Sequence, residues 1–310
     1  MVKGVKDSLS SSDFSEFFGF YPFRRRWGSR IRPHFSFTYS GVTFHVDSSK
    51  GRAGEVNLIT HAHTDHHGQK NVKNEFALSS KETAKILEAC CGEYRGISFE
   101  VGESVKVRGV RIRTYHTHHM HGSSAFYFDN GLLVTGDVKD YRSLPKCRVL
   151  VTEATYGFRH YVFEDEIDKL VRVERGSILG AYPIGKAQRA AEILLDAGYD
   201  VCVEGKGRIV CEKLGIEVGE NGEVTITSPR ELGKYRGYWG RKYILTAQEF
   251  YRYPRIVLSD HLDYEGILRM IEHCNPECVL FYHGKPGGEL LEEVRGMGYE
   301  VSTLDALDVV

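Results

Sequence analysis

The 310-residue sequence lacks the features of disulfide-rich, fibrous and membrane-spanning chains. Its seven cysteines are odd in number and form no CxxC pair, which argues against a disulfide framework and against a cysteine zinc finger. With 33 glycines and 8 prolines, it is neither collagen-like nor low in complexity. No apolar run approaches the roughly 18 residues of a membrane helix, and the N-terminal segment lacks the apolar core of a secretory signal. We therefore expect a soluble cytoplasmic protein that makes no membrane contact.

The sequence also has no excess of charge of either sign. Its 41 Lys and Arg against 42 Asp and Glu leave a formal net charge of −1, without the basic excess of many nucleic-acid-binding proteins. Histidine is abundant, with 14 residues, and it is the commonest metal ligand as well as a frequent acid or base. Two bound divalent ions would make the total charge positive, so near-neutrality does not exclude a polyanionic substrate.

Two patterns of secondary structure follow one another along the chain. Residues 1–30 are polar and indicate a loosely packed arm. From residue 31 to 150, short β-branched and aromatic runs alternate with glycines, and Asn130-Gly131 is a hairpin signal, so we expect enough strands for two sheets. A capping pattern at Ser79 and Glu82 predicts a helix over 80–91.

After residue 150, predicted strands alternate with predicted helices, which indicates parallel α/β units. The pattern predicts helices in FEDEIDKLVRVE (163–174) and GKAQRAAEILLDAG (185–198), and a later helix stops at Asn275-Pro276. The segment 208–254 follows no clear pattern.

The densest group of ligand-type side chains lies in LITHAHTDHHG, where a predicted strand ends. It supplies His61, His63, Asp65 and His66 within six residues, at the carboxyl end of a strand, where open sheets place their sites. Imidazole and carboxylate ligands without thiolate suit Zn²⁺, with Mn²⁺ or Fe as alternatives, and favour a catalytic site with an open position.

HAHTDH resembles the HxHxDH signature of the metallo-β-lactamase superfamily, and further motifs of that family follow in order. Asp47 in VTFHVD resembles the aspartate that orients the histidine loop, and Asp137 in LLVTGD resembles the aspartate that bridges two metals. Four histidines share the next loop (116, 118, 119 and 121), and the spacing to Gly122-Ser123 selects His119. The resemblance implies seven metal ligands: His61, His63 and His119 for one ion, Asp65, His66 and His283 for the other, and Asp137 between them.

Glu153 in TEATYG, His261 in LSDHLDY and His283 in VLFYHG resemble the additional motifs of the β-CASP nuclease branch. LGAYPIGKAQRA and SDHLDYEGIL are most similar to DNA-ligase-associated exonucleases and to archaeal exonuclease-like proteins of mRNA 3′-end processing. The resemblance implies an α/β fold: a four-layer αββα metallo-β-lactamase sandwich over 31–175 and 255–310, with a small β-CASP cap over 176–254.

The resemblance also implies a mechanism. Two divalent ions, Zn²⁺ or Mn²⁺, would share a hydroxide nucleophile and clamp a phosphoryl group. His261 is the predicted general acid and Glu153 would orient it, so Asp47, Asp65, Glu153 and His261 form the predicted catalytic set. The predicted substrate-binding residues are Gly185, Lys186 and Ser259, the first two at a helix start that suits phosphate.

The basic, aromatic segment 230–243 has two interpretations of equal weight. Its aromatic faces would stack on unpaired bases while its cations follow the phosphates, or the same residues would form an ordinary domain surface.

The function expected from these motifs is metal-dependent hydrolysis of phosphodiester bonds in DNA or RNA, exonucleolytic rather than endonucleolytic, on single strands rather than duplexes. Its partners would be DNA-repair or RNA-processing proteins. A hydrolase of small esters, lactones or thioesters on the same core is an alternative, because one fold hosts many reactions. An inactive subunit that binds nucleic acid is a weaker alternative, because all seven ligand positions are filled. His283 does not decide between DNA and RNA.

Overall fold

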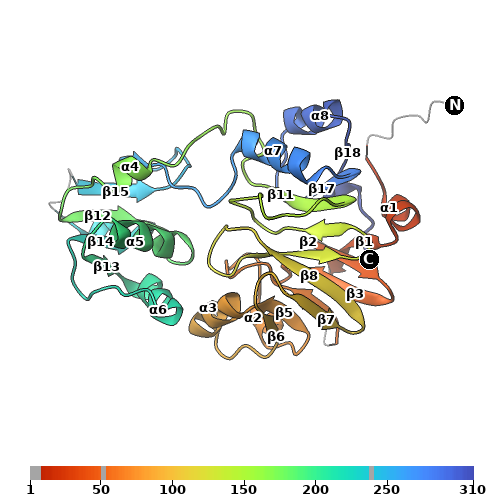
Figure 1. The fold of residues 1–310 in the computed structure, drawn as a ribbon, viewed down its shortest axis with the longest axis horizontal. Helices are drawn as coiled ribbons and strands as arrows, with labels where there is room; N and C mark the ends of the chain where they lie inside the picture. The colour runs from red at the N-terminus through yellow and green to blue at the C-terminus, as the bar shows by residue number, and fades with distance from the viewer. Residues whose placement is uncertain (1–7, 50–53, 237–240) are drawn as a thin grey trace. The chain divides into compact units, whose positions relative to one another are not determined.

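The computed structural model describes residues 8–49, 54–236 and 241–310 (Figure 1). It is a mixed α/β protein with three β-sheets, and the chain divides into two units. Unit 1 comprises Met1–Ala84, Glu93–Val162 and His261–Val310, and unit 2 comprises Lys85–Gly92 and Phe163–Asp260. Within the described ranges, no helix is both long enough and apolar enough to cross a membrane.

Unit 1 contains two sheets. The first has the order β1 (Tyr21–Trp27), β2 (Arg30–Tyr39), β3 (Val42–Val46), β4 (Val56–Leu58), β5 (Ala77–Ser80) and β6 (Ile97–Phe99). β1, β2 and β3 pair antiparallel, and β3 to β6 pair parallel, so β3 belongs to both parts of the sheet. Helix α2 (Gln69–Val72) lies between β4 and β5 in sequence. Helix α3 (Lys81–Cys91), close to the predicted helix over 80–91, lies between β5 and β6, and its residues from Lys85 onward belong to unit 2.

The second sheet has the order β18 (Glu300–Thr303), β17 (Cys278–Gly284), β11 (Val149–Ala154), β10 (Leu132–Val134), β9 (Ser124–Phe128), β8 (Val110–His116) and β7 (Ser104–Val107). Strands β10, β11, β17 and β18 run parallel. β9 and β10 pair antiparallel across Asn130-Gly131, which confirms the predicted hairpin.

Alternation along the strands builds the core of unit 1. In β11, Val149 and Val151 face a cluster shared with the first sheet, while Leu150 faces the other side. The shared cluster is rich in phenylalanine, including Phe37 and Phe128, because two sheets pack face to face there. On the far side of the second sheet lie α7 (Tyr264–Cys274) and α8 (Gly288–Gly296). Asn275 ends α7 in the left-handed conformation, as Asn275-Pro276 predicts.

Unit 2 is a parallel sheet with the order β13 (Val201–Val203), β14 (Val224–Thr227), β12 (Ser177–Gly180), β15 (Lys242–Leu245) and β16 (Arg255–Ile256). Its helical segments are α4 (Ile167–Leu170), α5 (Lys186–Asp196), α6 (Gly205–Leu214) and the 3-10 segment η1 (Pro229–Lys234). The parallel α/β expectation is confirmed. The segment 208–254, which follows no clear sequence pattern, holds two of these strands as well as η1.

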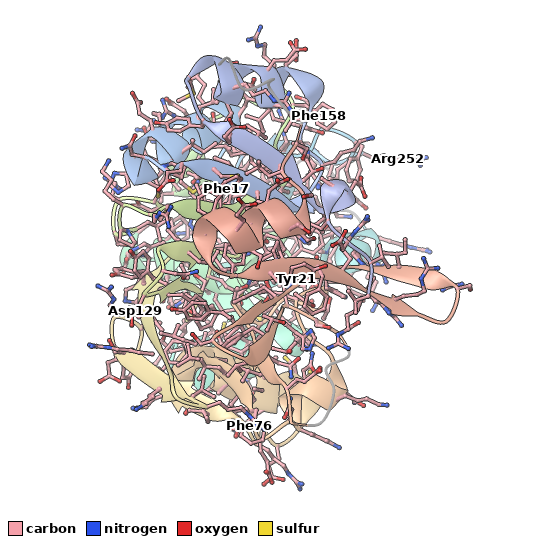
Figure 2. All side chains as sticks on the ribbon, turned by 90° about the vertical axis from the view of Figure 1, so that its right-hand side faces the viewer. Phe17, Tyr21, Phe76, Asp129, Phe158 and Arg252 are labelled. Carbon is pink, nitrogen blue, oxygen red and sulfur yellow. The ribbon has the colours of Figure 1, made fainter. Side chains whose placement is uncertain are left out.

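The N-terminal segment is more ordered than the sequence predicts. Residues Ser11–Phe18 form helix α1, which Ser10 and Asp13 cap reciprocally, and β1 follows it. The rings of Phe14 and Phe20 are buried in the core of unit 1, and this burial compensates for the entropy lost on ordering the arm. Phe17 lies on the outer side of α1, 45% exposed (Figure 2).

The helix predicted over 163–174 is shorter than expected, because α4 covers only Ile167–Leu170. Asp165 and Glu166 accept hydrogen bonds from the backbone of Ser259 and Val257, at 2.8 Å and 2.7 Å. These contacts engage the side chains of the first residues of the segment, and the helix begins only after them. They also explain why β16 ends at Ile256 instead of continuing along the predicted strand RIVLSDH.

Candidate metal centre

The sequence-predicted ligands converge at one edge of the two sheets of unit 1. Asp47 follows β3, the HAHTDH segment follows β4, and Asp137 follows β10. Glu153 lies near the end of β11 and His283 near the end of β17, while His119 follows β8, which has the direction of β10 because β9 is antiparallel to both. Parallel strands present their carboxyl ends at the same edge of a sheet, so residues far apart in sequence meet there.

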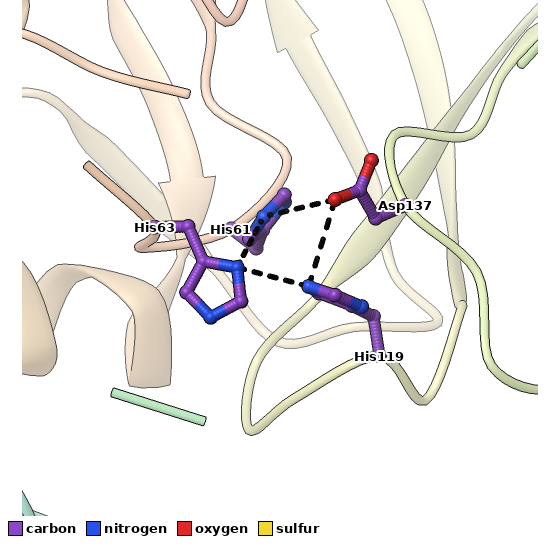
Figure 3. A group of neighbouring side chains, drawn as sticks. All are labelled: His61, His63, His119 and Asp137. Carbon is purple, nitrogen blue, oxygen red and sulfur yellow. Dashed lines mark hydrogen bonds and ion pairs between the residues drawn. The ribbon is translucent and has the colours of Figure 1, made fainter. Parts of the chain in front are cut away.

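Four side chains form the first ligand group: His61, His63, His119 and Asp137 (Figure 3). His63 Nδ1 lies 3.1 Å from His61 Nε2 and 3.0 Å from His119 Nε2. Asp137 Oδ2 lies 3.7 Å from the Nε2 atoms of both His61 and His119. The three ring nitrogens and one carboxylate oxygen thus point into a common space.

These separations fit a metal ion. Ligand atoms placed tetrahedrally at about 2.1 Å from an ion lie about 3.4 Å from one another. The four separations given above range from 3.0 to 3.7 Å, and all four ligand atoms lie within 4.8 Å of one another. The cluster could therefore hold a metal ion.

Asp65, His66 and His283 form a second group beside the first. Asp65 Oδ2 lies 3.9 Å from the Nε2 atoms of both His66 and His283. His66 Nε2 is also 3.5 Å from Asp137 Oδ2, so that carboxylate oxygen adjoins both groups. His66 Nε2 and Asp137 Oδ1 are buried without a hydrogen-bond partner in the described part of the chain. Such orphaned atoms are costly in a folded protein, and a bound cation would satisfy them.

Asp47 organises the second group without joining it. Its carboxylate accepts hydrogen bonds from Thr60 N–H and Thr60 Oγ1, both at 2.8 Å. It also lies 2.9 Å from His66 Nδ1 and accepts a 2.9 Å hydrogen bond from Tyr282 Oη. Because His66 Nδ1 is engaged in this way, its Nε2 faces Asp137. Asp47 has a φ of 49°, an uncommon conformation that four hydrogen bonds hold in place.

Charges in the cluster are poorly balanced without a cation. Burial lowers the pKa of His61 well below its ordinary value, and the charges of neighbouring imidazoles add to that effect. Burial also disfavours the charged form of His66, but the carboxylates of Asp137 and Asp47 outweigh it and raise the pKa of His66 to about 10. Burial and the charge of Glu153 raise the pKa of Asp137. Divalent cations would take the place of the proton that His66 holds in their absence, and their charge would balance the carboxylates.

Glu153 and His261 form a pair next to the first group. His261 Nδ1 lies 2.8 Å and 3.0 Å from the two carboxylate oxygens of Glu153, which also accepts hydrogen bonds from Val138 N–H at 2.7 Å and from Thr155. Burial by itself would raise the pKa of Glu153, but the charge of His261 and these hydrogen bonds lower it. The imidazole of His261 is therefore held beside an ionised carboxylate, and its ring centroid is 4.5 Å from that of His119.

Comparison of the sequence with known proteins finds a distant relative. A protein from Opitutus terrae named "Probable DNA ligase" is a distant homologue, 26% identical over 298 aligned residues. The match covers 78% of this chain and 28% of that protein, so the chain spans little more than a quarter of its relative. No family model matches the sequence.

Among solved structures, the fold is similar to that of a protein of unknown function from Enterococcus faecalis V583. The TM-score is 0.60, with 13% sequence identity over 82% of this chain and 91% of that one. At this identity the likeness concerns the fold alone.

The predicted substrate-binding residues lie in unit 2, away from solvent. The ammonium of Lys186 is buried and donates hydrogen bonds to Asp260 Oδ2 at 2.7 Å and to the Leu258 carbonyl at 2.9 Å. Ser259 is also buried, and Gly185 N–H donates to Gln188 Oε1 at 2.8 Å. A phosphate contact through Lys186 would have to compete with these bonds. It stays a prediction.

The basic, aromatic segment is only partly described, since residues 237–240 lie outside the described ranges. Two of its cations pair with nearby carboxylates, Lys234 with Glu231 and Arg241 with Glu174. Both interpretations of the segment stay open.

Two residues of the centre are missed by sequence reasoning, Thr60 and Tyr282. Thr60 Oγ1 donates to Asp47 and lies 2.9 Å from His61 Nδ1, so it links the orienting carboxylate to a ligand. Each residue directly precedes a predicted ligand in the sequence. That adjacency is the signal by which the sequence could have indicated them. It is weak for Tyr282, because the alternation along β17 also explains this residue as a core residue.

Glycine is required at position 136, just before Asp137. Its φ is 66°, and a Cβ there would lie 2.5 Å from the Cβ and Oγ1 atoms of Thr60. A side chain at this position would push Thr60 and Asp137 apart.

Proposed function

We propose that this protein is a metal-dependent hydrolase of phosphodiester bonds in nucleic acid, with a metallo-β-lactamase core and a β-CASP-type cap. In this proposal residues 31–175 and 255–310 form the core, built as a four-layer sandwich, and residues 176–254 form the cap. The observation that carries it is the meeting of two ligand groups at Asp137 with the Glu153–His261 pair beside them. The name of the distant homologue, a probable DNA ligase, supports a nucleic-acid substrate.

The proposal divides the donor atoms between two ions. His61, His63 and His119 would hold one ion, Asp65, His66 and His283 the other, and Asp137 would contact both. Bound there, a pair of divalent ions, Zn²⁺ or Mn²⁺, would activate water as a nucleophile and neutralise charge on the phosphoryl oxygens.

The remaining chemistry belongs to side chains of the protein. Hydrolysis replaces the bond between phosphorus and the leaving oxygen with a bond to a water oxygen, and the leaving oxygen needs a proton. His261 would supply that proton from Nε2, because Nδ1 is turned to Glu153. The Glu153 carboxylate favours the protonated imidazole and fixes its ring. A protein that hydrolyses thioesters has less need of such an acid, since a thiolate is easier to expel than an alkoxide.

The experiment supplies 5′-labelled and 3′-labelled DNA and RNA, single-stranded and duplex, to the purified protein with Zn²⁺ or Mn²⁺. Wild type should cleave at least one of these substrates, and Asp65→Ala should not. The labels report the polarity and the exonuclease or endonuclease mode. Failure to cleave any of them, together with turnover of a lactone or thioester, would overturn the proposal.

The role of His261 has its own test. His261→Ala should lose cleavage and keep wild-type metal content, because His261 is proposed as an acid and not as a ligand. His273→Ala is the matched control, since His273 lies on α7 and contacts the Leu144 carbonyl at 2.9 Å. Loss of metal in the His261 variant alone would instead identify His261 as a metal ligand, together with Asp137 and Glu153.

A further inference from the structure

A cleft in unit 1 adjoins the metal centre. It has a volume of about 670 Å³ and lies between the β1–β2 hairpin and the segment that follows β17. Asp47, Asp65 and His283 line one part of it, so the cleft is continuous with the second ligand group. A cavity of this size falls within the range of small-molecule binding sites.

The walls of the cleft combine cations with apolar surface. Arg24, Arg32 and Lys285 line it, and the apolar lining residues include Ile31 and Leu304. The charge of Arg24 is compensated, because its guanidinium lies 2.8 Å from Asp305, which also lines the cleft. Apart from Asp305, the carboxylates that line it are Asp47 and Asp65 of the metal centre. The wall beyond the centre therefore presents the cations Arg32 and Lys285 beside apolar surface.

Lys285 is the exposed lysine of this wall. It directly follows the end of β17, two residues after the predicted ligand His283. Gly284, between them, has a φ of 73°, and a Cβ on it would lie 2.6 Å from the backbone of Ala154. The chain therefore turns closely against β11 at this point, and this turn places Lys285 beside the centre while His283 remains in it.

This combination suits one class of ligand. A nucleotide has an anionic phosphate, which cations bind, and a base and sugar with apolar faces, which the remaining wall could cover. Neither an apolar metabolite nor a bare anion would use both halves of the wall. A nucleic-acid strand whose scissile phosphate lay at the metal centre would continue into a neighbouring site of this kind.

We propose that the cleft is a nucleotide-binding subsite that receives the nucleotide next to the scissile phosphate, with Lys285 and Arg32 at its phosphate. This inference rests on the proposed nuclease function and names a substrate contact within unit 1. It assigns recognition of the strand to residues that neither ligate metal nor transfer protons.

The first test is direct binding without catalysis. Adenosine 5′-monophosphate, adenosine 3′-monophosphate and adenosine are titrated calorimetrically into the EDTA-treated protein, so that no cleavage is needed. At least one nucleotide should bind, and Lys285→Ala should weaken its affinity by about tenfold, the effect of losing one charge-assisted contact. Lys285→Glu should weaken it further. The affinity for adenosine should be unaffected by either substitution.

The control is Lys106→Ala, because Lys106 is an exposed lysine of β7 that does not line the cleft. It should bind nucleotides like the wild type. Absence of nucleotide binding by the wild type, or equal affinities in wild type and both Lys285 variants, would overturn the inference.

Cleavage kinetics separate this inference from the proposed function. In an active nuclease, the Lys285 variants should raise KM with little change in kcat, since the residue binds substrate away from the reacting atoms. Cleavage with a wild-type KM in both variants would refute the cleft and leave the nuclease proposal standing. Lys285-dependent nucleotide binding by a protein that cleaves no nucleic acid and turns over a lactone or thioester would refute the nuclease proposal and support the cleft as a nucleotide site.

Discussion

The hydroxyl of Tyr282 offers a test of how the metal centre is held together. It donates a 2.9 Å hydrogen bond to Asp47 Oδ2, the oxygen that also engages His66 Nδ1. Burial and the charge of Asp47 raise the pKa of Tyr282 well above its ordinary value, so the phenol stays protonated and acts as a donor. Tyr282→Phe removes this donor and leaves the ring that packs in the core.

The size of the stability loss in Tyr282→Phe depends on the hydrogen-bond partners that Asp47 keeps. A hydrogen bond to a charged group contributes about 1.5–3 kcal/mol to stability. Asp47 keeps two donors from Thr60 as well as His66, so it is not left unsatisfied, and we expect the lower end, about 1.5 kcal/mol. Removing an outer partner of a metal ligand costs about 10–100-fold in metal affinity. With three partners left, we expect about tenfold at the site of His66.

Tyr264→Phe is the matched control. Tyr264 is also buried and its hydroxyl donates a 2.8 Å hydrogen bond to a carboxylate, that of Glu293, on the helical side of the second sheet. Zn²⁺ affinity is measured by competition with a chromophoric chelator, and stability by urea unfolding of the chelated proteins. Both variants should lose stability, but only Tyr282→Phe should lose metal affinity.

Two results would refute this reasoning. Unchanged metal affinity in Tyr282→Phe would mean that the hydroxyl does not orient the ligand group. An equal loss of affinity in Tyr264→Phe would mean that the effect is a general consequence of reduced stability.

Three further outcomes follow from the same geometry. Gly136→Ala should destabilise the protein by more than Gly41→Ala in urea unfolding, because both positions have a positive φ but only at Gly136 does a Cβ meet Thr60; equal losses would argue against the clash. In the chelated protein, the pKa of His66 is raised to about 10 from an ordinary 6.5, so its stabilising contribution is fully present below pH 6.5 and is lost as the pH rises toward 10. Urea midpoints between pH 7 and 10 should therefore fall more in wild type than in His66→Gln, and parallel curves would contradict the assignment. Zn²⁺ should raise the melting temperature of the EDTA-treated protein with increasing concentration, and Asp137→Ala should abolish most of that rise, because its carboxylate adjoins both ligand groups.

Local chemistry was readable from the linear sequence. The Asn130-Gly131 hairpin and the stop of α7 at Asn275 depend on backbone preferences of a few adjacent residues, and the structure confirms them. The same is true of the HAHTDH segment, whose ligand types lie within six residues. Motif resemblance extended this reasoning to Asp137, Glu153, His261 and His283, and the structure brings all four to the same edge of the sheets.

Elements whose conformation depends on distant partners could not be predicted from the sequence. The segment 163–174 has a helical pattern, but the side chains of Asp165 and Glu166 accept hydrogen bonds from residues more than 90 positions away, and the helix begins only at Ile167. The N-terminal arm is polar on average, yet a few buried phenylalanines suffice to order it against the core of unit 1. Lys186 follows a glycine at a helix start, as a phosphate-binding lysine does, but its charge is engaged by Asp260, 74 positions later.

The residue types that could hold metal, and their order along the chain, were properties of the sequence alone, because strand ends and ligand chemistry are local. Which nitrogen of each imidazole faces the cluster was decided only by tertiary structure. Tyr282 and Asp47 are separated by 235 positions, and Glu153 and His261 by 108. Such contacts form only after two sheets have packed on a common core. The cleft beside the centre has the same origin, since residues of the β1–β2 hairpin and of the segment after β17 line it together.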